Sequence, residues 1–189
     1  AIPGEVLVRV IREPLTEERI EITKKTNRQN AVKTKDFFAL EDFHRQLQRR
    51  FRVMGYFYEI QSGSYAQLDK SERHKFQGSP HYSHLRWARS DFRIPAIEAA
   101  KCHAAGFRFK VAVCYSNPSD VAPEGKYYPD IFPDELSDDP EAFLLPFLLM
   151  KHAETEYKYG ASKAEAYRRR GRYLFVAIAF RGLRPALVE

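Results

Sequence analysis

Two apolar patterns open the chain. Glu5–Glu13 is rich in β-branched residues, and its apolar and polar positions alternate, which predicts a strand buried mostly on one face. Thr16 can then cap a helix that carries glutamates in its first turn and Lys24 and Lys25 at its end, an arrangement that complements the helix dipole. The pattern therefore predicts a strand followed by a short helix.

A stronger helical pattern comes next. Phe43, Leu47 and Phe51 recur at positions i, i+4 and i+8. Asp42 stands where a helix cap is expected, and Gly55 stands where a helix commonly ends. We expect a helix between these two residues, with its aromatic face in the core.

The segment after this helix alternates as a strand does. Tyr56–Ile60 is aromatic and apolar, and Ser62–Ser64 is typical of a tight turn, so the pattern predicts a hairpin that returns through Tyr65. Residues 67–93 are polar and have few periodic apolar positions. They indicate a surface excursion or a link between two lobes.

The second half is patterned mainly for helices. Pro95 opens one that ends near Gly106, Pro140 opens a long one that runs to about Tyr159, and Ser162 caps another. Residues 107–115 alternate as a strand does, although their flanks suit a helix, and the pattern alone leaves both open.

These elements predict an α+β fold, with a small N-terminal sheet and its helices followed by a mainly helical C-terminal half. We expect an α/β lobe at 1–68 that holds an Asn-rich loop and the hairpin. A polar excursion or linker follows at 69–93, and a mainly helical lobe at 94–189.

Composition excludes several classes of protein. With 44% hydrophobic and 30% charged residues the chain is not of the disordered type, and it lacks the run of about 18 apolar residues that a membrane span needs. The only two cysteines, Cys102 and Cys114, are too few for a disulfide framework, so we expect a reducing, cytoplasmic location. The chain opens Ala-Ile-Pro-Gly-Glu, without an initiator Met or a signal peptide, which favours an excised domain.

The positive charge is uneven. Residues 1–95 hold 18 Lys and Arg against 12 Asp and Glu, whereas residues 96–189 hold 13 of each, so the net charge of +6 comes from the first half. With a pI near 9.3, this distribution favours an anionic partner such as nucleic acid. The alternative is that the charges simply solvate helix faces, which is their commonest role.

An amide-rich loop lies at Thr26–Asn30, between basic residues. Its Asn side chains could serve only the local backbone, or its amides could contact phosphates and base edges. Together with two tyrosines of the predicted hairpin, the loop gives the candidate nucleic-acid-binding residues. They are Lys24, Lys25, Asn27, Arg28, Gln29, Asn30, Lys33, Tyr58 and Tyr65.

One pattern resembles a metal-dependent nuclease. Glu59 lies two residues before Gln61 on a predicted strand, and such a site would hold Mg²⁺ with an additional upstream Asp. The upstream candidates Asp36 and Asp42 fall in helical patterns, so Glu59 is the sole catalytic candidate. The alternative is a surface Glu paired with Lys or Arg. The six histidines are scattered, and we expect no metal or other cofactor outside this alternative.

Four motifs occur in the order found in the abortive-infection phage-resistance family, AIPR, which the chain resembles. They are Asn27-Arg-Gln-Asn30, Asp36-Phe-Phe-Ala-Leu40, the Phe43–Phe51 helix and Tyr56-Phe-Tyr-Glu59-x-x-x-Gly63-x-Tyr65. Asn117-Pro118 and Tyr127-Tyr-Pro-Asp-Ile-Phe132 extend the similarity more loosely. The family's Asn-Gly-x-Gln-Thr motif, upstream of the first strand, is not in this sequence.

The resemblance implies a bacterial or archaeal protein of phage defence that acts near DNA, and it favours a helix at residues 107–115. Our first hypothesis is therefore a defence domain that binds DNA or RNA weakly and without sequence preference. One alternative is the Mg²⁺-dependent endonuclease with Glu59 and Gln61. The other is a protein-interaction module, in which the acidic run 130–141 of one copy meets a basic surface of another to form a homo-oligomer.

Overall fold

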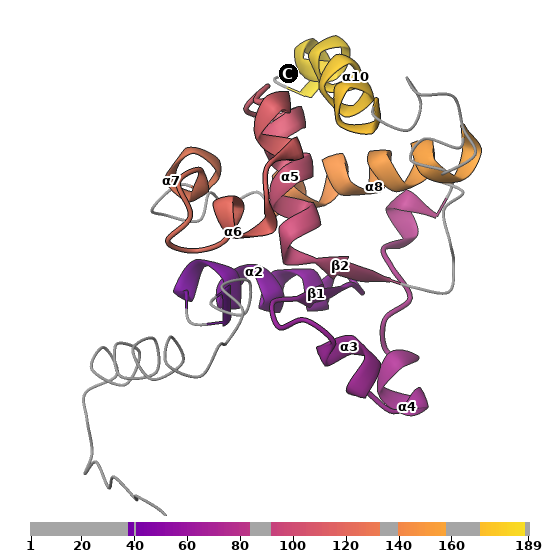
Figure 1. Ribbon diagram of the computed structural model, residues 1–189. Helices are drawn as coiled ribbons and strands as arrows, with labels where there is room; N and C mark the ends of the chain where they lie inside the picture. The colour runs from indigo at the N-terminus through magenta and orange to yellow at the C-terminus, as the bar shows by residue number, and fades with distance from the viewer. Residues whose placement is uncertain (1–37, 40, 84–91, 133–139, 158–170, 188–189) are drawn as a thin grey trace, which may run out of the picture. The chain divides into compact units, whose positions relative to one another are not determined.

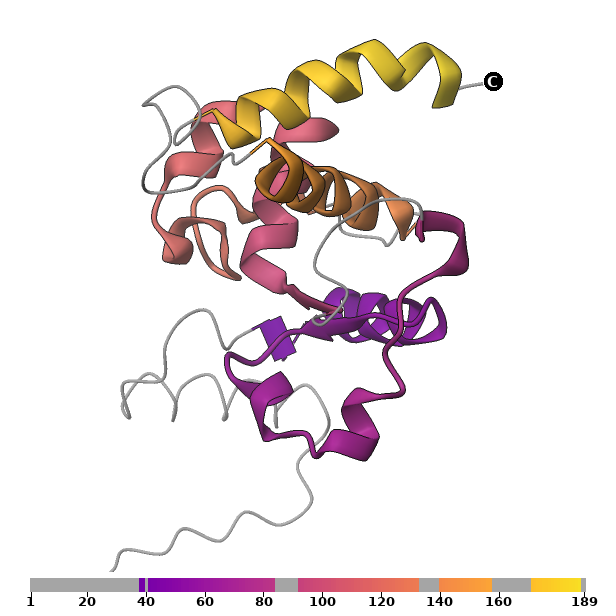
Figure 2. The same ribbon diagram turned by 90° about the vertical axis from the view of Figure 1, so that its right-hand side faces the viewer.

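Small side chains on one helix let three long helices pack closely. The computed structural model describes residues 38–39, 41–83, 92–132, 140–157 and 171–187. Within them, the alanine-rich helix α5 contacts both α8 and α10. Its buried residues are mostly alanines, which allow close approach because they add little bulk beyond the backbone. Figures 1 and 2 show α8 and α10 beside α5, with the strands and α2 below them and α3 and α4 at the bottom.

The described residues lie within the compact unit Thr34–Glu189. Their helices are α2 (Asp42–Val53), α3 (Ser64–Gln67), α4 (Lys70–Arg73), α5 (Ala96–Gly106), α6 (Pro118–Val121), α7 (Tyr128–Ile131), α8 (Glu141–Glu156) and α10 (Arg172–Leu187). The 3₁₀ helices are η2 (Pro80–Tyr82) and η3 (Val111–Tyr115), and the strands are β1 (Phe57–Glu59) and β2 (Arg93–Pro95). The fold is α+β, as predicted: a small sheet lies among the earlier helices, and the second half is helical.

Several predictions fall outside the described residues. These are the strand at Glu5–Glu13, the helix that begins at Thr16, the amide-rich loop at Thr26–Asn30 and the helix start at Ser162. The division of the chain at residues 68 and 93 stays a prediction.

The aromatic face predicted for the first strong helix is confirmed. Phe43, Leu47 and Phe51 of α2 are all buried in the core cluster, and α2 contacts β1. The helix begins one residue after Glu41 and is followed by Met54 and Gly55, close to the predicted end.

The predicted hairpin is wrong. β1 pairs in parallel with β2, with Tyr58 opposite Ile94, and Tyr65 belongs to helix α3 and not to a returning strand. The backbone N–H groups of Gly63 and Tyr65, which a hairpin would use in its ladder, are bound by the Glu59 carboxylate instead. The chain therefore turns into a helix directly after β1.

The segment 107–115 is neither the strand nor the continuous helix that we considered. Helix α5 ends at Gly106, Phe109 takes a left-handed conformation with φ of 53°, and only Val111–Tyr115 is helical, as the 3₁₀ helix η3. The backbone N–H of Lys110 bonds the carbonyl of Ala104, which reverses the chain after α5. This reversal explains why neither regular pattern persists.

Gly55 and Gly63 allow the cost of backbone strain to be distinguished from the cost of steric crowding. Gly55 has φ of 82° and Gly63 has φ of 87°, but only Gly55 has a close neighbour where a Cβ would stand. A Cβ at Gly55 would lie 2.8 Å from the Gly78 carbonyl oxygen, whereas a Cβ at Gly63 would meet nothing within 4 Å. We expect Gly63→Ala to lower the free energy of unfolding by about 1–2 kcal/mol, through backbone strain alone. Gly55→Ala should lower it by about 3 kcal/mol or more, because Gly78 must also move. Chemical denaturation of both variants measures the difference, and equal losses would contradict the close approach.

Candidate functional site

A buried histidine connects α2 to the sheet and to α7. His44 is fully buried, and its Nδ1 and Nε2 lie 3.0 Å from the hydroxyl oxygens of Tyr58 and Tyr128 respectively. A neutral imidazole has one donor and one acceptor, so one tyrosine donates to His44 and the other accepts from it. Both ring nitrogens are thereby bonded inside the core.

Burial keeps this network uncharged. It lowers the pKa of His44 to about 3 and raises the pKa of Tyr58 well above its usual value. The His44 ring also packs edge-on against Phe38 and Phe132, at centroid distances of 4.5 and 4.6 Å. The arrangement suits a structural connection between elements. Tyr58, a predicted nucleic-acid contact, is completely buried and leaves no surface for a partner.

Glu59, the predicted catalytic candidate, holds the start of α3. Its side chain is 6% exposed, and its Oε1 accepts hydrogen bonds from the backbone N–H groups of Gly63, at 3.0 Å, and Tyr65, at 3.3 Å. Its Oε2 lies 3.7 Å from Nη1 of Arg93 on β2. Both oxygens thus face positive or donor groups of the chain itself. Gln61, the second residue of the nuclease pattern, is exposed in the turn that follows.

The remaining predicted residues divide into two sets. Tyr65 is partly exposed and lines a groove described below. The other set lies outside the described residues: Lys24, Lys25, Asn27, Arg28, Gln29, Asn30 and Lys33. The proximity that we expected between Asn30 and Glu59 therefore stays a prediction.

A groove of about 650 Å³ lies beside α3 and α4 and combines cationic with aromatic side chains. Lys70, Arg73 and His74 line it, and because they stand at i, i+3 and i+4 they share one face of the α4 turn. The described residues that line it are Tyr65, Lys70, Arg73, His74, Phe76, Gln77 and Phe92, and none of these carries a carboxylate. We call this the basic–aromatic groove. The sequence gives no signal for these cations, because α4 has only four residues and carries no apolar period.

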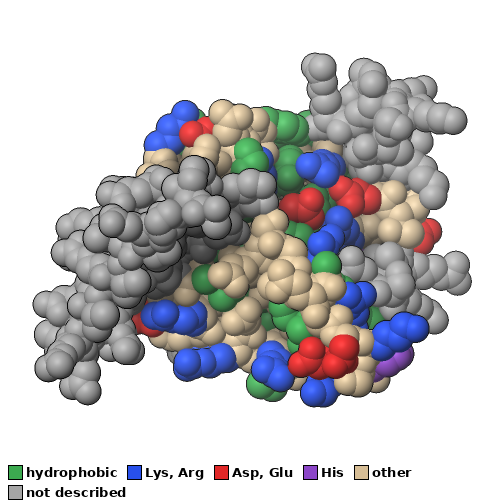
Figure 3. Space-filling model, turned by 60° about the horizontal axis from the view of Figure 1, so that its bottom comes forward, with side chains coloured by type: hydrophobic (Ala, Val, Ile, Leu, Met, Phe, Trp, Pro, Cys, Tyr) green, Lys and Arg blue, Asp and Glu red, His purple; other side chains and the backbone are tan. Residues whose placement is uncertain are grey.

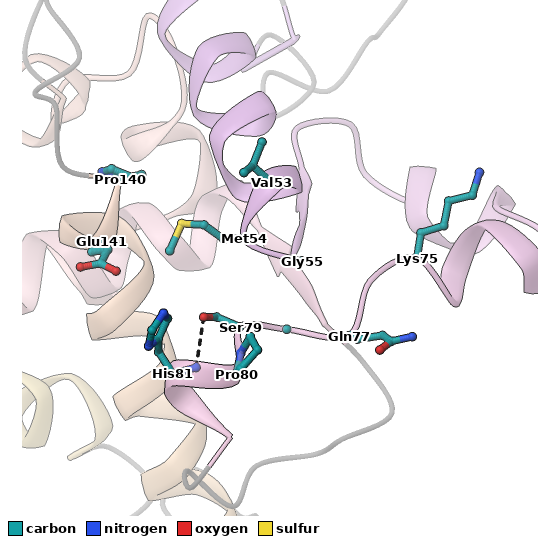
Figure 4. Close-up of a pocket in the computed structure, with 11 residues that line it drawn as sticks. Val53, Met54, Gly55, Lys75, Gln77, Ser79, Pro80, His81, Pro140 and Glu141 are labelled. Atoms are coloured by element: carbon teal, nitrogen blue, oxygen red, sulfur yellow. Dashed lines mark hydrogen bonds between the residues drawn. The ribbon is translucent and has the colours of Figure 1, made fainter.

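A second cavity, of about 710 Å³, adjoins the groove, since Gln77 lines both. Figure 4 shows Met54 pointing into it from the end of α2, with His81 and Glu141 on the far side. The close contact of Gly55 and Gly78, whose N–H donates to the Gly55 carbonyl at 2.9 Å, fixes its wall. The Tyr82 hydroxyl donates to Glu141 at 2.6 Å, and this bond ties η2 to the start of α8.

Further cations lie on α2. Arg49 and Arg52 are exposed, and neither forms an ion pair with another described residue. Figure 3 shows the face that includes α3 and α4, where Lys and Arg side chains are spread with a smaller number of Asp and Glu among them. This surface is thus basic where the structure describes it, in keeping with the excess charge of residues 1–95.

The described ranges hold neither a metal cluster nor a membrane-spanning helix. Among these residues there is no group of three or more His, Cys, Asp or Glu side chains that could hold a metal ion. In the same part of the chain, no helix has both the length and the apolar character that crossing a membrane requires.

The buried histidines make stability depend on pH. Burial lowers the pKa of His44 to about 3 and that of His103 to about 4, from the ordinary histidine value of 6.5. Between pH 6.5 and about 4 the unfolded chain binds protons that the folded chain does not, so stability is full above pH 6.5 and falls below it. We expect a loss of about 2 kcal/mol for each histidine between pH 7 and pH 5, measured by urea unfolding. His103→Phe should remove about half of this dependence, and an unchanged pH profile in that variant would contradict the assignment.

Removal of the Glu59 carboxylate should loosen the turn into α3. We expect Glu59→Ala to lower the free energy of unfolding by about 2–4 kcal/mol, because two backbone N–H groups lose a charged acceptor. Glu59→Gln should cost less, since its amide oxygen can still accept one of these bonds. Glu72→Ala, at an exposed position of α4, is the matched control and should change stability by less than about 0.5 kcal/mol. Equal, small effects at both positions would exclude the structural role of Glu59.

Comparison with known proteins places the chain in a family. The AIPR family model, described as AIPR protein, matches residues 3–182. Searches of curated proteins and of solved structures gave no match. The match includes the motif Tyr56-Phe-Tyr-Glu59-x-x-x-Gly63-x-Tyr65. Its members supply a tyrosine bonded to His44, the Glu59 carboxylate, both N–H groups that this carboxylate binds and one wall of the groove. The chain belongs to the AIPR family, which is linked to abortive infection and phage defence.

Proposed function

We propose that this chain contributes nucleic-acid binding to abortive-infection phage defence, through the basic surface of its first half. The observation that carries the proposal is the basic–aromatic groove, in which Lys70, Arg73 and His74 converge and no described residue contributes a carboxylate. Phosphates are the anions that such a set of cations commonly binds, and contacts of this kind hold nucleic acid without reading its sequence.

The exposed cations of α2 extend this surface. Arg49 and Arg52 stand at i and i+3, so they share one side of the helix and could follow a phosphate backbone. The amide-rich loop Thr26–Asn30 and its lysines would add further contacts to phosphates or base edges. The described helices include no recognisable groove-reading module, which favours binding without sequence preference.

We place this activity in the cytoplasm of a bacterial or archaeal cell. The proposal is supported by Cys102 and Cys114, which are buried free thiols of the kind that suit a reducing compartment. The Mg²⁺-dependent nuclease gains no support from Glu59, because its carboxylate is bound to Gly63, Tyr65 and Arg93. We therefore propose binding and not cleavage.

Binding to duplex DNA should be micromolar or weaker at physiological salt and should weaken steeply as salt rises. With about four to six phosphates neutralised, the slope of log K against log salt should lie near −4 to −5. Fluorescence titration of two duplexes of unrelated sequence, with Mg²⁺ present, measures both the slope and any sequence preference. No binding even at low salt would contradict the proposal and favour the protein-interaction module instead.

Charge reversal at one groove position tests where the nucleic acid binds. Lys70 lines the groove and forms no ion pair with another described residue, so Lys70→Glu should weaken binding about 3- to 10-fold and make the salt slope shallower by about one. The matched control is Lys110→Glu, an exposed lysine that lies 2.8 Å from Asp130 and outside the groove. The control should bind like the unmodified chain. Equal losses in both variants would mean that net charge, and not the groove, governs binding.

A further inference from the structure

Two aromatic side chains of the groove, Tyr65 and Phe76, form a packed cluster with Phe57. The rings of Tyr65 and Phe76 both lie 5.2 Å from that of Phe57, and they are 6.5 Å from each other. Phe76 is buried, whereas Tyr65 and Phe92 are partly exposed. The cluster therefore fixes the position of the Tyr65 ring and leaves part of it at the groove surface. The ring of Phe92 packs separately, 6.3 Å from that of Tyr56.

A cation is fixed against this cluster. The guanidinium of Arg73 lies 5.6 Å from the centre of the Tyr65 ring, and its Nη2 donates to the Ala66 carbonyl. Lys70 and His74 stand on the same face of the α4 turn and line the groove beside it. A planar guanidinium held in one place offers both a charge for a phosphate and a flat surface for a ring.

Cationic side chains can bind the phosphates of any nucleic acid. Partly exposed aromatic rings, by contrast, can stack only on bases whose faces are uncovered. In a duplex, each base is stacked between its neighbours and shows only its edges in the grooves. In a single strand the faces are available, and aromatic side chains beside a positive groove are the usual means of binding it. The ring surfaces of Tyr65 and Phe92 would contribute nothing to a duplex.

We propose that the basic–aromatic groove is a site for single-stranded nucleic acid, a reading that rests on the proposed function above. Bases stack on Tyr65 and Phe92, and Lys70 and Arg73 bind the adjoining phosphates. DNA and RNA share this chemistry, because each base has an aromatic face whatever the sugar.

A bound single strand of nucleic acid has room to continue beyond the groove. Gln77 lines both the groove and the second cavity, and Lys75 lies at the edge of that cavity. Basic side chains and an amide thus line the path between the two hollows, at Lys70, Arg73, His74, Lys75 and Gln77. This continuity suits an extended strand better than a single nucleotide.

The test compares ligands of equal length in the full chain, and among them the single strands also carry equal charge. A dT oligomer about 12 nucleotides long is titrated beside an abasic strand of the same length, a duplex of the same length and an rU oligomer. We expect the dT oligomer to bind at least about 10-fold more tightly than the abasic strand, because only the first has rings to stack. If the rU and dT oligomers bind with comparable affinity, the site accepts both RNA and DNA. If one of them binds much more tightly, the proposal is restricted to that kind of nucleic acid.

Variants of Tyr65 then locate the stacking. Tyr65→Leu keeps an apolar side chain but removes the ring, and it should weaken dT binding about 5- to 150-fold while leaving the abasic strand unaffected. Tyr65→Phe keeps the ring and should bind dT like the unmodified chain, and thermal unfolding of both variants confirms that they fold. Phe92→Leu repeats the test at the second ring.

The outcomes separate this inference from the proposed function. Equal affinity for the dT oligomer, the abasic strand and the duplex would overturn the single-strand site, yet would leave nucleic-acid binding intact. A loss of dT binding that Tyr65→Leu and Tyr65→Phe share would also overturn it, because the ring would then not be responsible. The absence of binding to every ligand would overturn the proposed function itself.

Discussion

The carboxylate of Glu59 is the interaction on which the described surface depends. From the end of β1, it binds two backbone N–H groups at the start of α3 and faces Arg93 on β2. A buried charge is stable only when such partners surround it, so the turn between β1 and α3 has little freedom. Arg73 then joins α4 to α3 through the Ala66 carbonyl and the Tyr65 ring. Glu59 and Arg73 thus connect the sheet, α3 and α4, and Asp69 caps the start of α4, which carries the groove cations.

The second half provides a rigid support for this surface. Lys151 of α8 lies between Glu98 of α5 and Glu154, at 3.5 and 3.1 Å, and Arg172 at the start of α10 bonds Glu154 at 3.0 Å. These partly exposed pairs contribute little energy, because water screens them. They define how the three helices meet, while the alanine face of α5 supplies the close packing. Since β2 leads directly into α5, the sheet is anchored to the helical half.

Prediction from sequence succeeded where a pattern was long. The period of Phe43, Leu47 and Phe51 identified α2, because one helix face repeats over three turns. Alternation at residues 56–60 identified β1 but not its partner, since pairing with Ile94 depends on a strand more than thirty residues away. Glu59 is a polar residue that is nevertheless buried in the fold. Its hydrogen bonds with two partly buried backbone N–H groups explain this burial. The groove cations share a four-residue helix, which is too short to leave a period. The predicted contacts at Lys24–Lys33 remain for experiment.

The parallel pairing of β1 and β2 also has a consequence for the order in which the molecule forms. Phe92 reaches the groove only once the residues between the strands have been closed into a loop, and closing a loop costs entropy before the contacts form. Helix α2, by contrast, needs only local contacts to begin. During synthesis, the ribosome must therefore release the chain past β2 before the groove has all of its walls. A nascent chain that ends before Phe92 carries the cations of α4 but lacks one of the groove's aromatic rings.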